Sequence, residues 1–161
     1  MATDANNILI GAATLSVGGV DIGFTKGGVS IRHEQEFLKV MADQAVGVVR
    51  QARTMERMYV KTTMLEVTLS NLRKAFMYPS ANLVGSTLTL GYNNACWVDA
   101  IQLIIVGVSP SCGTRTVTFP SAVKFNTTEY NMKRDEETAI EIEFEINKQG
   151  GSLIFGTMID S

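Results

Sequence analysis

The sequence predicts a mainly β protein: a β-sandwich or barrel of seven to nine strands, flanked by one short α-helix. Three observations support this class. Glycine pairs and other turn residues interrupt the chain at short intervals, and the segments between them alternate apolar and polar side chains with the two-residue period of a strand. Only one segment has apolar residues at helical spacing. The 161 residues fit one domain, 1–161, because domains commonly have about 100–150 residues.

Glycines mark the first hairpin and the first long strand. Gly18-Gly19 joins two alternating runs, 13–17 and 20–25, because both glycines can take the positive φ of a tight hairpin turn. A second turn at Lys26-Gly27-Gly28 precedes an extended run from Val29 to Met41. Neither face of that run is purely apolar, which is unusual for a strand packed on its own core. One face carries Ile31, His33, Gln35 and Phe37, and the other carries Arg32, Glu34, Glu36 and Leu38.

A long hairpin is expected next, with Ala42-Asp43-Gln44 at its apex. Over residues 46–67 the apolar period fits either a helix or a strand. β-Branched residues favour a strand over 58–67, and a strand is also predicted over 46–56. The one predicted helix spans Leu69 to Met77, after a capping Thr68 and before Pro79, which prevents its extension.

The rest of the chain is predicted to be β. Four strands are expected, over Leu83–Leu90, Cys96–Val108, Thr114–Phe125 and Glu136–Ile146. The last alternates well, with apolar residues on one face and glutamates on the other. The double glycine Gly150-Gly151 then precedes an apolar tail that contains Leu153, Ile154 and Phe155. That tail could fold back onto its own barrel or dock on a neighbouring subunit.

Composition argues against most enzymes and against nucleic-acid binding. Fourteen Lys and Arg against sixteen Asp and Glu give a net charge of −2, without the basic excess that phosphate binding requires. His33 is the only histidine, and Cys96 and Cys112 lie too far apart for a CxxC pair. We expect no enzyme activity, no metal site and no cofactor, with His33 exposed or at an interface. No signal peptide is evident, and the most apolar run, 101–108, is far shorter than the ~20 residues of a membrane-spanning helix.

Charge is unevenly distributed along the chain. Residues 1–80 carry a net +2 and residues 81–161 a net −4. A basic stretch at Arg50, Arg53, Arg57 and Lys61 contrasts with the acidic region 129–145. These segments are either two solvated faces or complementary surfaces on different subunits, where charge would orient docking.

The order of these features resembles the tail tube proteins of long-tailed bacteriophages. The resemblance covers residues 8–78 by pattern and the remainder by general β character. It rests on the Gly-rich hairpin 15–23, the run 25–31, Glu36 and Val40, Asp43-Gln44 with Gly47, and Glu66 before the helix that holds Leu69, Asn71 and Leu72.

The resemblance implies a structural virion protein that forms hexameric rings. Strands of each subunit would join a continuous inner barrel, and the rings would stack into the hollow tail tube that conducts phage DNA without binding it specifically. Assembly would take place in the bacterial host cytoplasm, without membrane insertion. The partners would be further copies of the chain, tape-measure and terminator or baseplate proteins and, in a contractile tail, a sheath protein. Three segments would become ordered on polymerisation: an N-terminal arm at 1–12, a long hairpin loop at 40–55 and a C-terminal arm at 150–161.

Two sets of residues follow as candidate sites. An acidic lumen would repel DNA phosphates, so we expect lumen-facing residues among Glu34, Glu36, Glu141, Glu143 and Glu145, although strand 136–146 could equally present its glutamates to the outer surface. Contacts between subunits or rings are expected at Asp43, Gln44, Arg50, Arg53, Arg57, Leu153, Ile154 and Phe155, with the arginines facing acids of region 129–145.

Several alternatives remain open on the sequence. The chain could be the tube subunit of a contractile injection or secretion system, a capsid-decoration protein, or a monomeric ligand-binding β-barrel. A small hydrolase is disfavoured by the missing catalytic triad. Cys96 is expected in the core beside Trp97, whereas Cys112 is expected in an exposed loop, where an intersubunit disulfide is conceivable.

Overall fold

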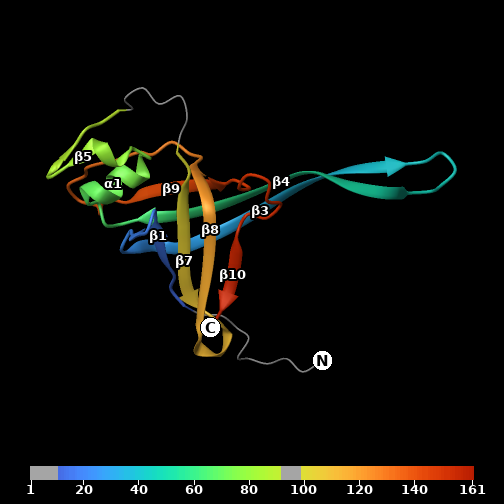
Figure 1. The fold of residues 1–161 in the computed structure, drawn as a ribbon, viewed down its shortest axis with the longest axis horizontal. Coiled ribbons are helices and arrows are strands. Elements are labelled where there is room, and N and C mark those ends of the chain that lie inside the picture. The colour runs from blue at the N-terminus through green and yellow to red at the C-terminus, as the bar shows by residue number, and fades with distance from the viewer. Residues whose placement is uncertain (1–10, 92–98) are drawn as a thin grey trace.

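The structure, a computed structural model, describes residues 11–91 and 99–161 and is mainly β with one short helix, which confirms the predicted fold class (Figure 1). The helical elements are α1 (Leu69–Ala75) and the 3-10 turns η2 (Ser80–Asn82) and η3 (Pro110–Cys112). The strands are β1 (Thr14–Val17), β2 (Val20–Asp21), β3 (Thr25–Met41), β4 (Val48–Met64), β5 (Leu83–Val84), β6 (Thr87–Leu88), β7 (Ile101–Val108), β8 (Thr114–Lys124), β9 (Ile140–Ile146) and β10 (Thr157–Asp160).

One antiparallel sheet forms the body of the molecule. Its strand order is β2-β1-β7-β8-β9-β4-β3, and β10 also pairs with β8. Strand β8 is shared: residues 115–118 pair with β10 and residues 122–124 pair with β9, along the same edge. In Figure 1, β7, β8 and β10 run across the direction of β3, β4 and β9. The sheet therefore folds over itself into two layers.

The hydrophobic core lies between these two layers. Inward side chains come from alternate positions of each strand, as the two-residue period requires. The layer of β1, β7 and β8 contributes Leu15, Val17, Leu103, Ile105, Val117 and Phe119; the layer of β4 and β9 contributes Val60, Met64, Ile140, Ile142, Phe144 and Ile146. No helix among the described residues is long and apolar enough to cross a membrane.

Helix α1 closes one end of the core. The hydroxyl of Thr68 accepts a hydrogen bond from the backbone N–H of Asn71 at 3.2 Å, which is the expected N-cap. The buried amide of Asn71 donates to the carbonyls of Ile22 and Glu66, at 3.0 and 2.9 Å, and so ties the helix to the first hairpin. The helix ends at Ala75, two residues earlier than expected.

Two predicted strands differ from the structure. Residues 83–90 form a small separate hairpin of β5 and β6, with Gly85 at positive φ in its turn, instead of one strand. Strand β9 begins at Ile140, not Glu136, because its neighbour β4 ends at Met64, the residue opposite Ile140. Alternation continues upstream of Ile140, but no strand is there to pair with. The expected start of the third strand at Cys96, and the core position of that cysteine, lie outside the described residues.

The C-terminal segment is built into the fold of its own chain. Strand β10 pairs with β8, and the guanidinium of Arg115 donates two hydrogen bonds to the carboxylate of Asp160, at 2.6 and 2.7 Å. A Cβ at Gly156 would collide with the carbonyl oxygen of Thr118, so a residue without a side chain is needed there. The expectation of a free C-terminal arm at 150–161 is therefore wrong for its last strand. The N-terminal arm lies almost entirely outside the described residues.

Strands β3 and β4 form a hairpin that projects far beyond the body (Figure 1). Of strand β4, only residues Met58–Met64 pair with β9. Between residue 58 and the apex of the hairpin, β3 and β4 therefore pair only with each other among the described residues. We call residues 36–55 the arm. The predicted loop at 40–55 is mostly strand: β3 continues to Met41, β4 starts at Val48, and only residues 42–47 form the apex. Bulges interrupt the pairing after Glu36 and after Val40.

Candidate assembly surfaces

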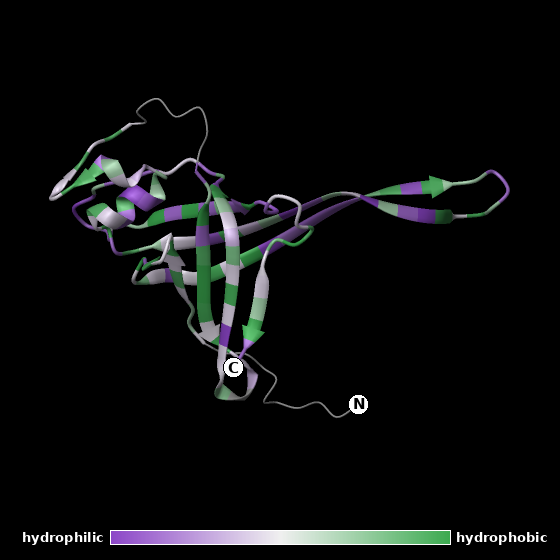
Figure 2. Ribbon diagram, in the orientation of Figure 1, coloured by the Kyte–Doolittle hydropathy of each residue, from purple (hydrophilic) through white to green (hydrophobic). Residues whose placement is uncertain are grey.

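The arm exposes many large apolar side chains. Every residue from 36 to 55 is exposed, and apolar and polar positions are interspersed along both strands (Figure 2). An isolated two-stranded hairpin is marginally stable in water, and a large exposed apolar patch typically marks an interaction surface. The arm therefore has the character of a docking element. Its exposed large hydrophobic residues are Phe37, Leu38, Val40, Met41, Val46, Val48, Val49 and Met55.

Strand β3 also presents a long open edge. It stands at the end of the strand order and, among the described residues, pairs only with β4. An open edge of this length offers a row of backbone donors and acceptors to another chain, and natural proteins usually cover such an edge. The arm and this edge together form one extended surface without a partner inside the described chain.

The five glutamates proposed for a lumen gather on one face. In the register of the sheet, Glu34 is opposite Arg57, and Glu145 is opposite Tyr59. Strand alternation then puts all five on the side of β3, β4 and β9 that faces away from the core. We call this side the glutamate face. Its carboxylates are Glu34, Glu36, Glu141, Glu143 and Glu145.

Basic residues are interleaved with these glutamates. Arg32 lies 3.2 Å from carboxylate oxygens of both Glu34 and Glu143, and Lys61 lies 2.9 Å from Glu141. With Arg57 and with Lys26, which is opposite Thr63 on this side of the sheet, four bases accompany the five glutamates, so the face keeps a small acidic excess. The expected pairing of region 129–145 with another subunit stays a prediction, and Glu141 and Glu143 have ion-pair partners in their own chain. Glu137 likewise pairs with Lys26.

The predicted contact residues occupy different environments. Asp43 and Gln44 lie exposed at the apex of the arm, and Arg50 lies exposed on its second strand. Arg53 instead pairs with Glu56 on its own strand, at 3.2 Å. Arg57 lies on the glutamate face, opposite Glu34. The structure therefore does not bring the three arginines together as one free basic surface.

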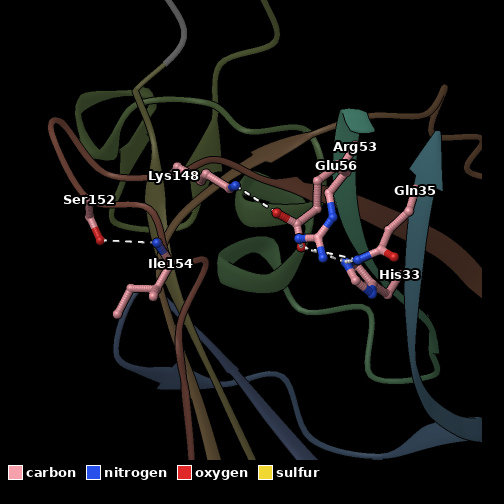
Figure 3. A network of polar contacts seen from close by, with 7 residues as sticks. All are labelled: His33, Gln35, Arg53, Glu56, Lys148, Ser152 and Ile154. Carbon is pink, nitrogen blue, oxygen red and sulfur yellow. Dashed lines mark hydrogen bonds and ion pairs between the residues drawn. The ribbon is translucent and has the colours of Figure 1, made fainter. Parts of the chain in front are cut away.

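A polar network anchors the base of the arm (Figure 3). The carboxylate of Glu56 lies 2.9 Å from His33 Nε2, 3.2 Å from Arg53 Nη1 and 2.7 Å from Lys148 Nζ. The hydrogen bond from Lys148, followed by that from His33, lowers the pKa of Glu56 to about 2. Sequence reasoning left His33 as exposed or interfacial and did not single out Lys148. A contact between residues 56 and 148 has no local sequence signal.

Phe155 links this network to the core. The Lys148 ammonium lies 4.8 Å from the centre of the Phe155 ring, and the His33 ring meets that ring edge to face at 6.4 Å. Phe155 itself is buried in the core cluster. The prediction of an intersubunit contact for Phe155 is therefore corrected: its side chain packs within its own chain.

Leu153 and Ile154 differ from Phe155 in being exposed. They border an apolar cleft of about 320 Å³ between the C-terminal segment and the two layers. The N–H of Ile154 donates to the hydroxyl of Ser152 at 3.2 Å, which orients this turn (Figure 3). Leu153 and Ile154 remain candidates for contacts with another chain. The cleft also includes Ile31, Met58, Val117, Phe119 and Met158.

The network predicts a specific pH dependence. Glu56→Gln should lower the stability of the chain at neutral pH, because the folded state stabilises the ionised carboxylate. The pKa of Glu56 is below its ordinary 4.5 in the folded protein, so its contribution is fully present above about pH 4.5 and is lost as the pH falls towards 2. Urea unfolding of both proteins between pH 2 and 7 measures this: the two stability curves should converge at the acidic end. A gap that stays constant with pH would contradict the assignment.

The described residues include no group of three or more His, Cys, Asp or Glu side chains arranged to hold a metal ion. Cys112 is an exposed free thiol, as expected from its loop.

Comparison with known proteins finds a similar fold among solved structures. No protein-family model and no curated protein matches the sequence. Among solved structures, the fold is similar to a chain of an extracellular contractile injection system, the PVC sheath–tube complex in its extended state. The TM-score is 0.55 at 10% sequence identity, over 93% of this chain and 89% of that one. At this identity the likeness concerns the fold, which this chain shares over nearly its whole length with a component of that particle.

Proposed function

We propose that this chain is the subunit of a hollow tube in a phage-tail-like particle, with a structural and not an enzymatic role. The observation that carries the proposal is the combination of a projecting arm, exposed throughout and rich in large apolar residues, with an open β3 edge. A chain that functions alone has no use for either feature, and both favour aggregation if they stay uncovered. Contacts with identical copies would cover them.

The structural comparison supports the same conclusion. The similar chain belongs to a complex that is named as a sheath and a tube, and the match extends over most of both chains. A comparison that aligns nearly complete chains involves the whole architecture and not a common fragment such as a single hairpin.

Within this proposal, the copies form hexameric rings and the rings stack. The opposite face of β3, β4 and β9 packs on the core, and the glutamate face could line a channel through its exposed members Glu34, Glu36 and Glu141. Its acidic excess would repel the phosphates of DNA, so that phage DNA could pass without binding. The particle would be a virion tail assembled in the host cytoplasm, with tape-measure and terminator or baseplate proteins as further partners.

A second candidate is the inner tube of a contractile injection system, which the structural neighbour specifically favours. In that case a sheath protein would surround the tube and the cargo would differ from DNA. Purification of native particles separates the two candidates: a tail tube accompanies a DNA-filled capsid, whereas an injection system is purified with a sheath and without a capsid.

Electron microscopy of the purified chain tests the central proposal. Hollow filaments or six-fold rings at raised concentration are expected, together with oligomers in analytical ultracentrifugation. A chain that remains a monomer at millimolar concentration would support the ligand-binding barrel instead.

The lining of the tube can be tested by charge reversal. We expect Glu141→Lys tubes to take up short duplex DNA and to protect it from nuclease, because Glu141 lies on the glutamate face. The control is Asp99→Lys, which makes the same charge change at an exposed residue just before β7. DNA bound to control tubes should remain sensitive to nuclease. Equal protection by both variants, or by neither, would contradict a lumen position for the glutamate face.

A further inference from the structure

We propose that the arm of one copy docks on residues 129–137 of a second copy, which we call the acidic loop. This inference rests on the proposed function and specifies which two surfaces meet. Both surfaces of the proposed contact, the arm and the acidic loop, belong to the described part of the chain.

The two surfaces carry opposite charge. The arm, residues 36–55, has three bases, Lys39, Arg50 and Arg53, and two acids, Glu36 and Asp43, so its net charge is +1. Arg53 is paired with Glu56, which leaves Lys39 and Arg50 as the bases without an ion pair in the described chain. The acidic loop has four acids and two bases. Two of its acids are paired within the chain, Glu136 with Lys133 and Glu137 with Lys26. Glu129 and Asp135 form no ion pair among the described residues, so they remain available to a basic partner.

The acidic loop also has the conformation of a recognition segment. Residues 125–139 connect β8 to β9 without regular secondary structure, and all residues from 129 to 137 are exposed. Loops of this length inside a compact domain usually serve a function. The loop also exposes Met132 and Tyr130, which offer apolar area to the hydrophobic residues at the end of the arm. Charge would orient the approach, and apolar contact would hold it.

The two surfaces lie at opposite ends of the molecule. The Thr128 hydroxyl, just before the acidic loop, donates to the Ala75 carbonyl at the end of α1, and Ile140, just after it, pairs with Met64. The apex of the arm is at the other end of β4 (Figure 1). An arm therefore cannot reach the acidic loop of its own chain. Contacts between unlike surfaces at opposite ends are head-to-tail, and such contacts generate rings or filaments and not closed two-fold dimers.

Cross-linking between separately purified chains tests this pairing. In a background with Cys96→Ser and Cys112→Ser, one pool carries Val46→Cys at the apex of the arm and the other carries Met132→Cys in the acidic loop. A short bismaleimide added to mixed, assembled chains should give a covalent dimer that contains one chain from each pool. Neither pool alone should give that dimer, and neither should Val46→Cys mixed with Gln149→Cys, an exposed control position.

Charge exchange provides an independent readout. Arg50→Glu should raise the concentration needed for polymerisation at least tenfold, and combination with Asp135→Arg should restore it, whereas combination with Asp99→Arg should not. The inference is overturned if wild-type tubes form but Val46→Cys cross-links to Ile154→Cys at the C-terminal cleft and not to Met132→Cys. If the wild-type chain never polymerises, the proposed function fails as well, and that outcome is distinct.

Discussion

A variant without the arm should remain folded and lose polymerisation completely. The variant joins Glu36 to Met55 through an Asn-Gly turn in place of residues 37–54, because Glu36 and Met55 are opposite each other in the register. All the removed residues are exposed, so the core between the two layers keeps every member. The arm also carries eight of the exposed large apolar residues of the described chain. We expect no filaments in electron micrographs at concentrations where the wild-type chain forms them, and a thermal unfolding midpoint within a few degrees of wild type.

A second variant separates the apolar surface of the arm from its length. It keeps all residues of the hairpin but replaces Met41, Val46 and Val48 by serine, so that the reach of the arm is unchanged. Polymerisation should again be strongly weakened, because burial of such side chains contributes about 1.5–3 kcal/mol each. Normal tubes from either variant would show that the arm is not an assembly element.

Phe155→Ala should destabilise the isolated chain by about 3 kcal/mol, which is typical of a buried phenylalanine. Phe155 packs in the core cluster, and its ring also contacts Lys148 and His33 at the base of the arm. Truncation would leave a cavity and remove both contacts. Urea unfolding at neutral pH, at a concentration below that of assembly, measures the loss.

Leu153→Ala is the matched control for this experiment. Leu153 lies two residues earlier and is 85% exposed, so its truncation should change the unfolding free energy of the isolated chain by less than about 0.5 kcal/mol. If Leu153→Ala impairs polymerisation while the chain remains stable, Leu153 belongs to an interface. Equal and small losses for Phe155→Ala and Leu153→Ala would contradict the placement of Phe155 in the core.

Local patterns predicted most of the strands. The two-residue alternation located β8 and most of β9, and the Gly18-Gly19 pair located the β1–β2 turn. The apex of the long hairpin was also predicted correctly, because a run of turn residues interrupts two extended segments. These successes share a cause: strand period and turn chemistry are properties of neighbouring residues, which can be recognised before any partner is known.

The candidate sites were only partly predictable. Alternation showed that Glu141, Glu143 and Glu145 share a side of one strand, and that Glu34 and Glu36 share a side of another. It did not show that the two sides coincide, because that depends on the register of β4 with both neighbours. For Phe155 the sequence predicted a contact with another subunit, whereas its side chain packs in the core of its own chain. An apolar tail after two glycines has the same sequence pattern in both cases.

The order of residues alone predicts that this chain is rich in β-structure and has extended segments that are not purely apolar on either side. Pairing between distant segments established the rest: β10 joins β8, Glu56 meets Lys148, and the five glutamates gather on one face. The physical reason is that alternation specifies which side chains share a face of a strand, whereas the hydrogen-bonded partners of that strand come from anywhere in the chain. The arm could be recognised as an exposed apolar surface only in the folded chain, because buried and exposed apolar residues look alike in the sequence.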